Sequence, residues 1–262
     1  MFTLAHILWL VVCFAGAFAA FWYLLKYKPS LQKVLSVACV GCVISELVKT
    51  FSVLQMVPSA DGSTMHLYLE MHHLPFHLCS IQIAMIFFAR FSKNEKLRET
   101  VLAFMYPTCT IGAFLAIMMP SIFTADTTVA DAFLHGHPYQ YFLYHAMLVV
   151  LGMYIALCKE VNIQPKHYLS TMGILGTMAF ASIYLNSMFA VPTYENGQLV
   201  SVDFSTNFFF TQETPLNIPL TQMWHWFVYL AVILALGITL IGLFYYPYFR
   251  KAKKQKREMT KA

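Results

Sequence analysis

Seven runs of mostly apolar residues divide this chain, and each is about the length that crosses a bilayer as a helix. They lie at residues 4–25, 34–57, 75–91, 99–119, 139–158, 168–191 and 222–247. Because backbone groups in lipid must satisfy one another's hydrogen bonds, runs of this length predict helices. The sequence therefore predicts an all-α, polytopic membrane protein, folded as a bundle of seven transmembrane helices.

The composition supports this class. Hydrophobic residues make up 59% of the 262 residues and charged residues only 11%, whereas soluble domains carry about 25% charged residues. The sequence has no phosphate-binding loop, no dinucleotide fingerprint and no nucleic-acid-binding signature. We therefore expect no cofactor and no nucleic-acid partner, while the oligomeric state is left open.

The basic residues predict the orientation. All of the 17 Lys and Arg residues except Lys49 follow the first, third, fifth or seventh run, and the loops on the other side carry only acidic charges. The positive-inside rule then places the N-terminus outside and the C-terminus in the cytoplasm of a multi-pass cell-membrane protein. We predict a transmembrane domain at residues 1–249 and a basic cytoplasmic tail at residues 250–262.

Aromatic residues gather near the ends of the predicted spans. Trp and Tyr at such positions usually lie at the level of the lipid head groups. We therefore predict an interfacial belt that consists of Trp9, Trp22, Tyr23, Tyr139, Tyr141, Trp224, Trp226, Tyr245 and Tyr246.

Polar side chains inside the spans are candidates for function, because charge in hydrocarbon is costly. Glu46 and Lys49 lie three residues apart and share one helical face, either as a neutralising pair or as a site for a substrate or proton. If successive spans cross the membrane in opposite directions, polar residues of five helices lie in its outer half. We predict that they line one outward-opening cavity: Glu46, Lys49, Cys79, Gln82, His145, Asn186, Gln222 and His225.

The most unusual stretch is the entrance to the third run, at residues 72–82. Pro75 is predicted to lie in the first turn of the helix, where proline is tolerated. That leaves His77 at the mouth and Cys79 inside the cavity. A cysteine becomes a nucleophile when a histidine takes its proton, and His145 on another helix is a candidate partner. Such a pair can also be two ordinary buried side chains.

Metal binding is the competing chemistry. His73 and His77 are four residues apart with Cys79 nearby, and His135 and His137 form a second outer group. No recognised zinc spacing such as H-E-x-x-H occurs, so we assign no metal ligands and keep an outer metal site as a third hypothesis.

The segment Leu74-Pro75-Phe76-His77-Leu78-Cys79-Ser80-Ile81 resembles the signature of the YwaF family of bacterial integral membrane proteins. Tyr144-His145-Ala146 and the run from Tyr184 to Phe189, which contains Asn186, fit the same pattern. The likeness extends over roughly the second to the seventh span. The YwaF family is similar to animal transmembrane acyltransferases that use a cysteine and a histidine, and more distantly to membrane threonine–histidine lipid hydrolases.

This resemblance implies a phospholipid O-acyltransferase or lipid hydrolase with Cys79 as nucleophile and His145 as base. The implied substrates are a membrane phospholipid and a lysophospholipid or water, and the implied intermediate is an acyl thioester. Glu46, Lys49, His77, Gln82, Asn186 and His225 are the predicted substrate-binding or supporting residues. The alternative is a transporter or receptor-like protein without covalent chemistry, in which Glu46 and Lys49 form the site.

Overall fold

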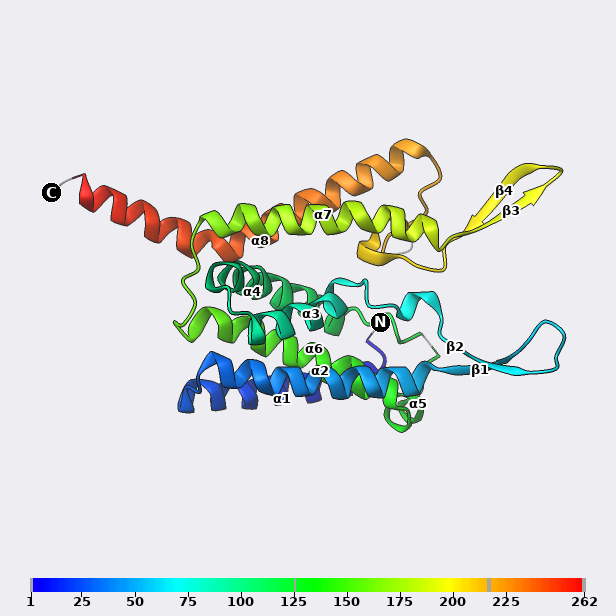
Figure 1. Ribbon diagram of the computed structural model, residues 1–262, viewed down its shortest axis with the longest axis horizontal. Helices are drawn as coiled ribbons and strands as arrows, with labels where there is room; N and C mark the ends of the chain where they lie inside the picture. The colour runs from blue at the N-terminus through cyan, green and yellow to red at the C-terminus, as the bar shows by residue number, and fades with distance from the viewer. Residues whose placement is uncertain (1, 125, 216–217, 261–262) are drawn as a thin grey trace. The chain divides into compact units, whose positions relative to one another are not determined.

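The computed structural model describes residues 2–124, 126–215 and 218–260 (Figure 1). Its helices are α1 (Leu4–Tyr27), α2 (Leu31–Val53), α3 (Leu78–Phe91), α4 (Glu95–Met118), α5 (Val129–Leu134), α6 (Gly136–Leu157), α7 (Lys166–Met188) and α8 (Met223–Met259). Its strands are β1 (Gln55–Pro58), β2 (Met65–Tyr68), β3 (Val191–Glu195) and β4 (Gln198–Asp203). Two short 3-10 helices are η1 (Met71–His73) and η2 (Phe208–Phe210).

The predicted seven-span, all-α fold is confirmed. In the described part of the chain, α1, α2, α4, α6, α7, α8 and the segment from η1 through α3 are long and apolar enough to cross a membrane. The side of the membrane that each end faces stays a prediction. α8 runs without a break from the apolar run into the basic tail, up to Met259. Lys261 of that tail lies outside the described residues.

The chain forms two compact units. The first contains the chain up to Leu69 together with Ile81–Ile163, and the second contains Glu70–Ser80 and the chain from Gln164 onward. In the first unit, α6 packs against α1, α2, α4 and α5. In the second unit, α7 packs against α8 and η2. The division into a domain at 1–249 and a tail stays a prediction.

The core of the first unit contains Trp9, which the sequence analysis assigned to the interfacial belt. Trp9 is only 1% exposed, and its ring is stacked between Phe133 and Phe142 at centroid distances of 4.9 and 5.0 Å. Its indole N–H donates a hydrogen bond to the carbonyl oxygen of Ala132. The belt assignment is therefore wrong for Trp9, whose polar N–H finds a partner inside the protein.

The closest helix packing in this unit lies between α6 and α4. A Cβ atom at Gly152 would lie 2.9 Å from both the Thr110 nitrogen and the Tyr106 carbonyl oxygen. Both are backbone atoms of α4, in the turns that surround Pro107. Only glycine permits this approach without a shift of one helix.

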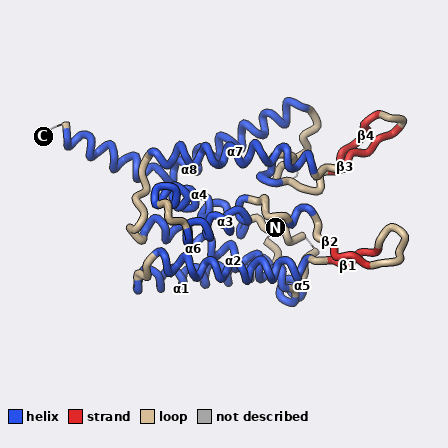
Figure 2. Tube along the Cα trace, viewed as in Figure 1, coloured by secondary structure: helices blue, strands red, loops and turns tan. Residues whose placement is uncertain are grey.

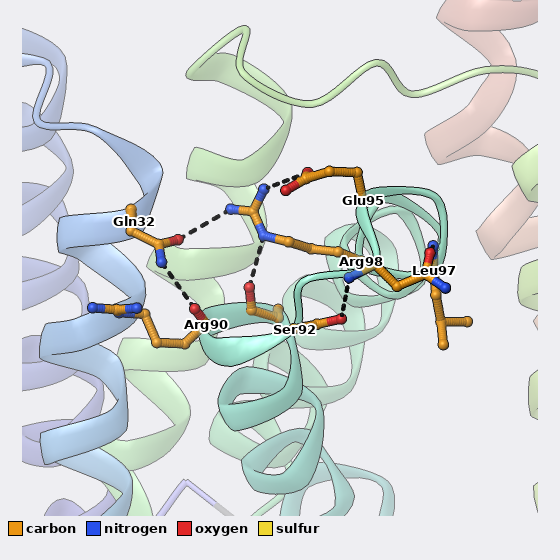
Figure 3. Close-up of polar contacts among 8 residues, drawn as sticks. Gln32, Arg90, Ser92, Glu95, Leu97 and Arg98 are labelled. Carbon is orange, nitrogen blue, oxygen red and sulfur yellow. Dashed lines mark hydrogen bonds and ion pairs between the residues drawn. The ribbon is translucent and has the colours of Figure 1, made fainter.

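A polar cluster fastens the α3–α4 connection to α2 at one end of the first unit (Figure 3). The Arg98 guanidinium donates to Gln32 Oε1 at 3.2 Å, to Glu95 Oε2 at 3.3 Å and to the Ala89 carbonyl oxygen at 2.8 Å. Gln32 in turn donates to the Arg90 carbonyl oxygen at 2.9 Å. These contacts use the fixed donor fork of arginine to hold three chain segments together.

The second unit buries a second member of the predicted belt. Tyr245 of α8 is fully buried, and its hydroxyl lies 3.0 Å from Thr171 Oγ1 of α7. Beyond its midpoint, therefore, α8 meets α7 through a hydrogen-bonded pair. The interfacial assignment of Tyr245 is wrong for the same reason as that of Trp9.

Two antiparallel hairpins follow α2 and α7 (Figure 2). The sequence analysis extended the second and sixth spans to residues 57 and 191, but α2 ends at Val53 and α7 at Met188. In the second hairpin, Asn196 and Gly197 have φ of 50° and 75°, which fits the two-residue turn that joins tight hairpins. Both hairpins expose most of their side chains.

The entrance to α3 also differs from expectation. Pro75 lies in a turn before the helix, and α3 begins at Leu78. The residues from Leu74 to His77 are therefore non-helical.

Candidate functional site

Cys79 is the second residue of α3 and is partly buried. It lies in the first turn, where the backbone N–H groups have no carbonyl partner within the helix. Their partial positive charge stabilises negative charge on a side chain placed there. This position therefore suits a thiolate, and the later start of α3 moves Cys79 closer to the helix end than the sequence predicted.

His77 and Phe76 precede α3 and both lie against Phe208 of η2. The ring centroid of Phe208 is 4.9 Å from that of His77 and 5.5 Å from that of Phe76, in edge-on geometry. Phe189, which follows α7, approaches the same ring at 6.4 Å. Phe208 is fully buried, so it forms the centre of an aromatic cluster just ahead of Cys79.

Asn186 of α7 holds Phe208 through its backbone. The side-chain oxygen accepts from the Phe208 N–H at 2.9 Å, and the side-chain nitrogen donates to the Phe208 carbonyl oxygen at 3.1 Å. The same amide accepts from the Thr206 hydroxyl at 3.1 Å and donates to Thr211 Oγ1 at 2.9 Å. Asn186 is fully buried, so all four contacts are made away from water. The predicted supporting residue therefore has a defined structural role as a clamp on η2.

The segment around η2 has a strained backbone. Phe209 and Phe210 adopt left-handed φ values of 56° and 53°, which cost roughly 1–3 kcal/mol each for residues other than glycine. Two side chains of α8 bind this backbone: Trp226 donates to the Thr211 carbonyl oxygen and Tyr229 to that of Phe210. The surrounding contacts therefore impose the loop conformation.

His225, the last predicted site residue of the second unit, lies in the first turn of α8. Its Nδ1 is 3.3 Å from Thr221 Oγ1, and its ring stands against Trp224 at a centroid distance of 4.0 Å. These contacts tie the start of α8 to the end of the preceding loop.

His145 of α6 belongs to the first unit and is only 3% exposed. Its Nδ1 is 2.6 Å from the carbonyl oxygen of Tyr141. A carbonyl oxygen can only accept, so Nδ1 carries the hydrogen, and in the neutral ring Nε2 holds the lone pair. The tautomer is therefore the one in which Nε2 can take up a proton. The rings of Tyr141 and Tyr144 pack against the imidazole, with centroid distances of 4.4 and 5.7 Å.

Gln82 of α3 is fully buried in the first unit. Its side-chain nitrogen donates to Thr108 Oγ1 at 3.0 Å, and its oxygen accepts from Cys109 Sγ at 3.2 Å. Both partners belong to α4, so Gln82 braces α3 against α4 three residues beyond Cys79.

Glu46 and Lys49 form the predicted ion pair on α2. Lys49 Nζ lies 2.9 Å from one carboxylate oxygen of Glu46 and 2.8 Å from the other. Glu46 also lines an apolar groove of about 340 Å³ between α2 and α3, together with Ile83 and Phe87 of α3. The acidic member of the pair therefore lines an apolar groove.

A second cavity, of about 520 Å³, lies at the end of the first unit that carries α5. Its lining includes Asp126, Asp131, His135 and His137. The Thr128 side chain and N–H donate to the Asp131 carboxylate and lower the pKa of that carboxyl, which completes the capping box of α5 with Thr128 as the N-cap. Among the residues that the structure describes, no three His, Cys, Asp or Glu side chains are grouped to hold a metal ion.

The predicted site residues thus divide between the two units. Glu46, Lys49, Gln82 and His145 lie in the first unit, and His77, Cys79, Asn186 and His225 lie in the second. Within the second unit, His77 and Asn186 both contact Phe208.

Phe208 and its neighbours Thr206 and Thr211 were not among the predicted site residues. The Phe-Phe-Phe run between polar residues in the segment between α7 and α8 was the available signal for this cluster.

A sequence model described as the TMEM164 family matches residues 1–245. No curated protein and no solved structure matches the chain. The narrower resemblance to YwaF proteins stays a prediction. The chain belongs to the TMEM164 family of membrane proteins.

Proposed function

We propose that this TMEM164-family protein is a lipid acyltransferase or lipid hydrolase that carries the acyl group as a thioester on Cys79. The donor is a membrane phospholipid, and the acceptor is a lysophospholipid or water. His145 acts as the base, and Lys49 binds the lipid phosphate as a charge-assisted donor.

The proposed reaction has two balanced halves. Nε2 of His145 takes the thiol proton as Sγ of Cys79 attacks the ester carbonyl carbon. The C–O bond to glycerol breaks, and the leaving alkoxide takes the proton from the imidazolium. In the second half, the acceptor hydroxyl gives its proton to Nε2 and attacks the thioester, and the sulfur leaves as thiolate and is reprotonated by His145.

The observation that carries this proposal is the tautomer of His145. Its Nδ1 is bound to the Tyr141 carbonyl oxygen at 2.6 Å, and a base needs its other nitrogen unprotonated. The position of Cys79 in the first turn of α3 adds support, because this environment favours the thiolate that attacks the ester.

Acyl labelling tests the proposal directly. Purified protein is incubated with phospholipid that carries a labelled acyl chain, and hydroxylamine-sensitive label on the protein is measured. We expect label on the wild type, none on Cys79→Ala, and full label on Cys158→Ala, which removes another partly buried cysteine. Label that persists in Cys79→Ala rejects the proposed nucleophile.

The base is tested separately. We expect His145→Gln to slow labelling by about 100-fold or more, the usual effect of losing a general base. His167→Gln is the matched control, because His167 is equally buried but lies on α7. Equal labelling rates in His145→Gln and the wild type would remove His145 from the mechanism.

A transporter or receptor-like function is the second candidate, favoured by the Glu46–Lys49 ion pair. There the pair binds a proton or a polar substrate, and Cys79 has only a packing role. Glu46→Gln then abolishes function and Cys79→Ser preserves it, whereas the acyl-transfer reaction requires the thiol and predicts the reverse order of severity.

A further inference from the structure

Three segments of the second unit meet at Phe208. Asn186 fixes its backbone from α7, Phe76 and His77 contact its ring from the segment before α3, and Cys79 follows two residues after His77. We infer that Asn186 and Phe208 are positioning residues, which set the start of α3 and thereby the place of Cys79. The inference rests on the proposed role of Cys79 as nucleophile.

These contacts fix the Phe208 ring relative to α7. The Asn186 amide binds both backbone groups of Phe208, so the ring cannot shift along η2 without breaking two buried hydrogen bonds. Phe76 and His77 are non-helical, and their rings meet Phe208 edge-on, a geometry favoured by aromatic quadrupoles.

The strained backbone at Phe209 and Phe210 agrees with this role. A left-handed pair of phenylalanines persists only where neighbouring contacts impose it. Trp226 and Tyr229 of α8 supply such contacts. The loop that carries Phe208 is therefore held by both α7 and α8, and it places the buried Phe208 ring against the segment before α3.

The test uses two readouts on the full-length protein in detergent. Hydrogen exchange of peptides covering residues 76–82 reports the start of α3, and mass spectrometry reports the rate at which iodoacetamide alkylates Cys79. Cys158, also partly buried but in the first unit, is the internal reference. We compare Phe208→Leu and Asn186→Asp with Phe180→Leu, an exposed phenylalanine of α7.

We expect Phe208→Leu and Asn186→Asp to speed exchange at residues 76–82 by at least tenfold and to change the Cys79 alkylation rate. The Cys158 rate and the exchange of α6 should stay at wild-type values, as should every readout in Phe180→Leu. Wild-type exchange at residues 76–82 in both variants overturns the inference. So does a change spread evenly over the whole chain in Phe208→Leu, which buries no new charge, because that indicates a general loss of stability.

Acyl labelling separates this inference from the proposed function. If the wild type takes no acyl label but the variants loosen residues 76–82 selectively, the positioning contacts stand and the acyl-transfer reaction fails. If the wild type is labelled, a positioning role predicts that Phe208→Leu is labelled more slowly. The same variant should show faster hydrogen exchange at residues 76–82 and not elsewhere.

Discussion

α6 and α7 are apolar helices of nearly equal length that are stabilised differently. In α6, 56% of the most apolar 18-residue window is buried, against 11% in α7. α6 packs closely against α4 at Gly152, where backbone atoms of the two helices meet. α7 instead binds its neighbours through hydrogen bonds from Thr171, Ser182 and Asn186.

This difference in packing predicts which substitutions each helix tolerates. Close packing makes α6 sensitive to added volume, because a tightly packed interior cannot absorb an extra methyl group without a shift. Buried hydrogen bonds make α7 sensitive to lost polar atoms, because their partners are then left unsatisfied.

The largest expected effect is on the polar contacts of α7. Asn186→Leu leaves the Phe208 N–H and the Thr206 hydroxyl without their acceptor, whereas the Phe208 carbonyl oxygen and the Thr211 hydroxyl keep each other and Ser182 as partners. We expect a loss of about 3 kcal/mol in the free energy of unfolding, since each buried unsatisfied group costs about 1–3 kcal/mol. Thermal unfolding in detergent measures it. Ser187→Ala, on the exposed face of the same helix, should unfold at the wild-type temperature.

A smaller effect is expected from volume in α6. Gly152→Ala places a methyl carbon 2.9 Å from two backbone atoms of α4, so we expect a loss of about 2 kcal/mol by overpacking. Gly173→Ala on α7 is the matched control, because no heavy atom lies within 4 Å of its added Cβ. It should be neutral or raise the unfolding temperature, since alanine favours the helix. Equal losses in the two variants would remove the contrast between the helices.

The smallest effect concerns the two hairpins and pH. Hydrogen bonds from the Ser59 hydroxyl and from the Ser63 N–H and hydroxyl lower the pKa of Asp61, in the β1–β2 turn, to about 2. Because these hydrogen bonds favour the ionised carboxylate, they stabilise the turn above pH 4. This stabilisation is lost as the pH falls through about 2. We expect amide protection in β1–β2 to decrease between pH 4 and pH 2. In the β3–β4 hairpin the two turn residues, Asn196 and Gly197, do not titrate, and the nearest carboxylate, that of Glu195, belongs to the end of β3.

Protection is read by hydrogen exchange, with rates corrected for the intrinsic effect of pH. Asp61→Asn should abolish the extra pH dependence of β1–β2. A parallel decrease in both hairpins would contradict the role of the Asp61 carboxylate.

The apolar runs predicted the seven spans because a bilayer sets one length for every crossing helix. The Glu46–Lys49 pair was likewise readable, since its partners are three residues apart on one helix. The hairpins were missed because short strands next to apolar helices read as helix ends, although Asn196-Gly197 between β-forming residues is a hairpin signal. Asn186 was found as a polar exception in a span.

Its partners lie 20 to 25 residues away, so local pattern could not identify them. The burial of Trp9 and Tyr245 was missed for a similar reason. Position near a span end does not reveal whether another helix covers the ring.

The continuity of α8 has a mechanical consequence. At 1.5 Å per residue, its 37 residues extend about 55 Å, well beyond the roughly 30 Å of bilayer hydrocarbon. The basic side chains from Arg250 to Arg257 therefore lie on the same helix as the membrane segment, just beyond Pro247. Inserting one alanine after Phe249 would turn all of them by about 100° around the helix axis and advance them by about 1.5 Å. The direction in which these side chains point from the helix axis therefore depends on the number of helical residues before them.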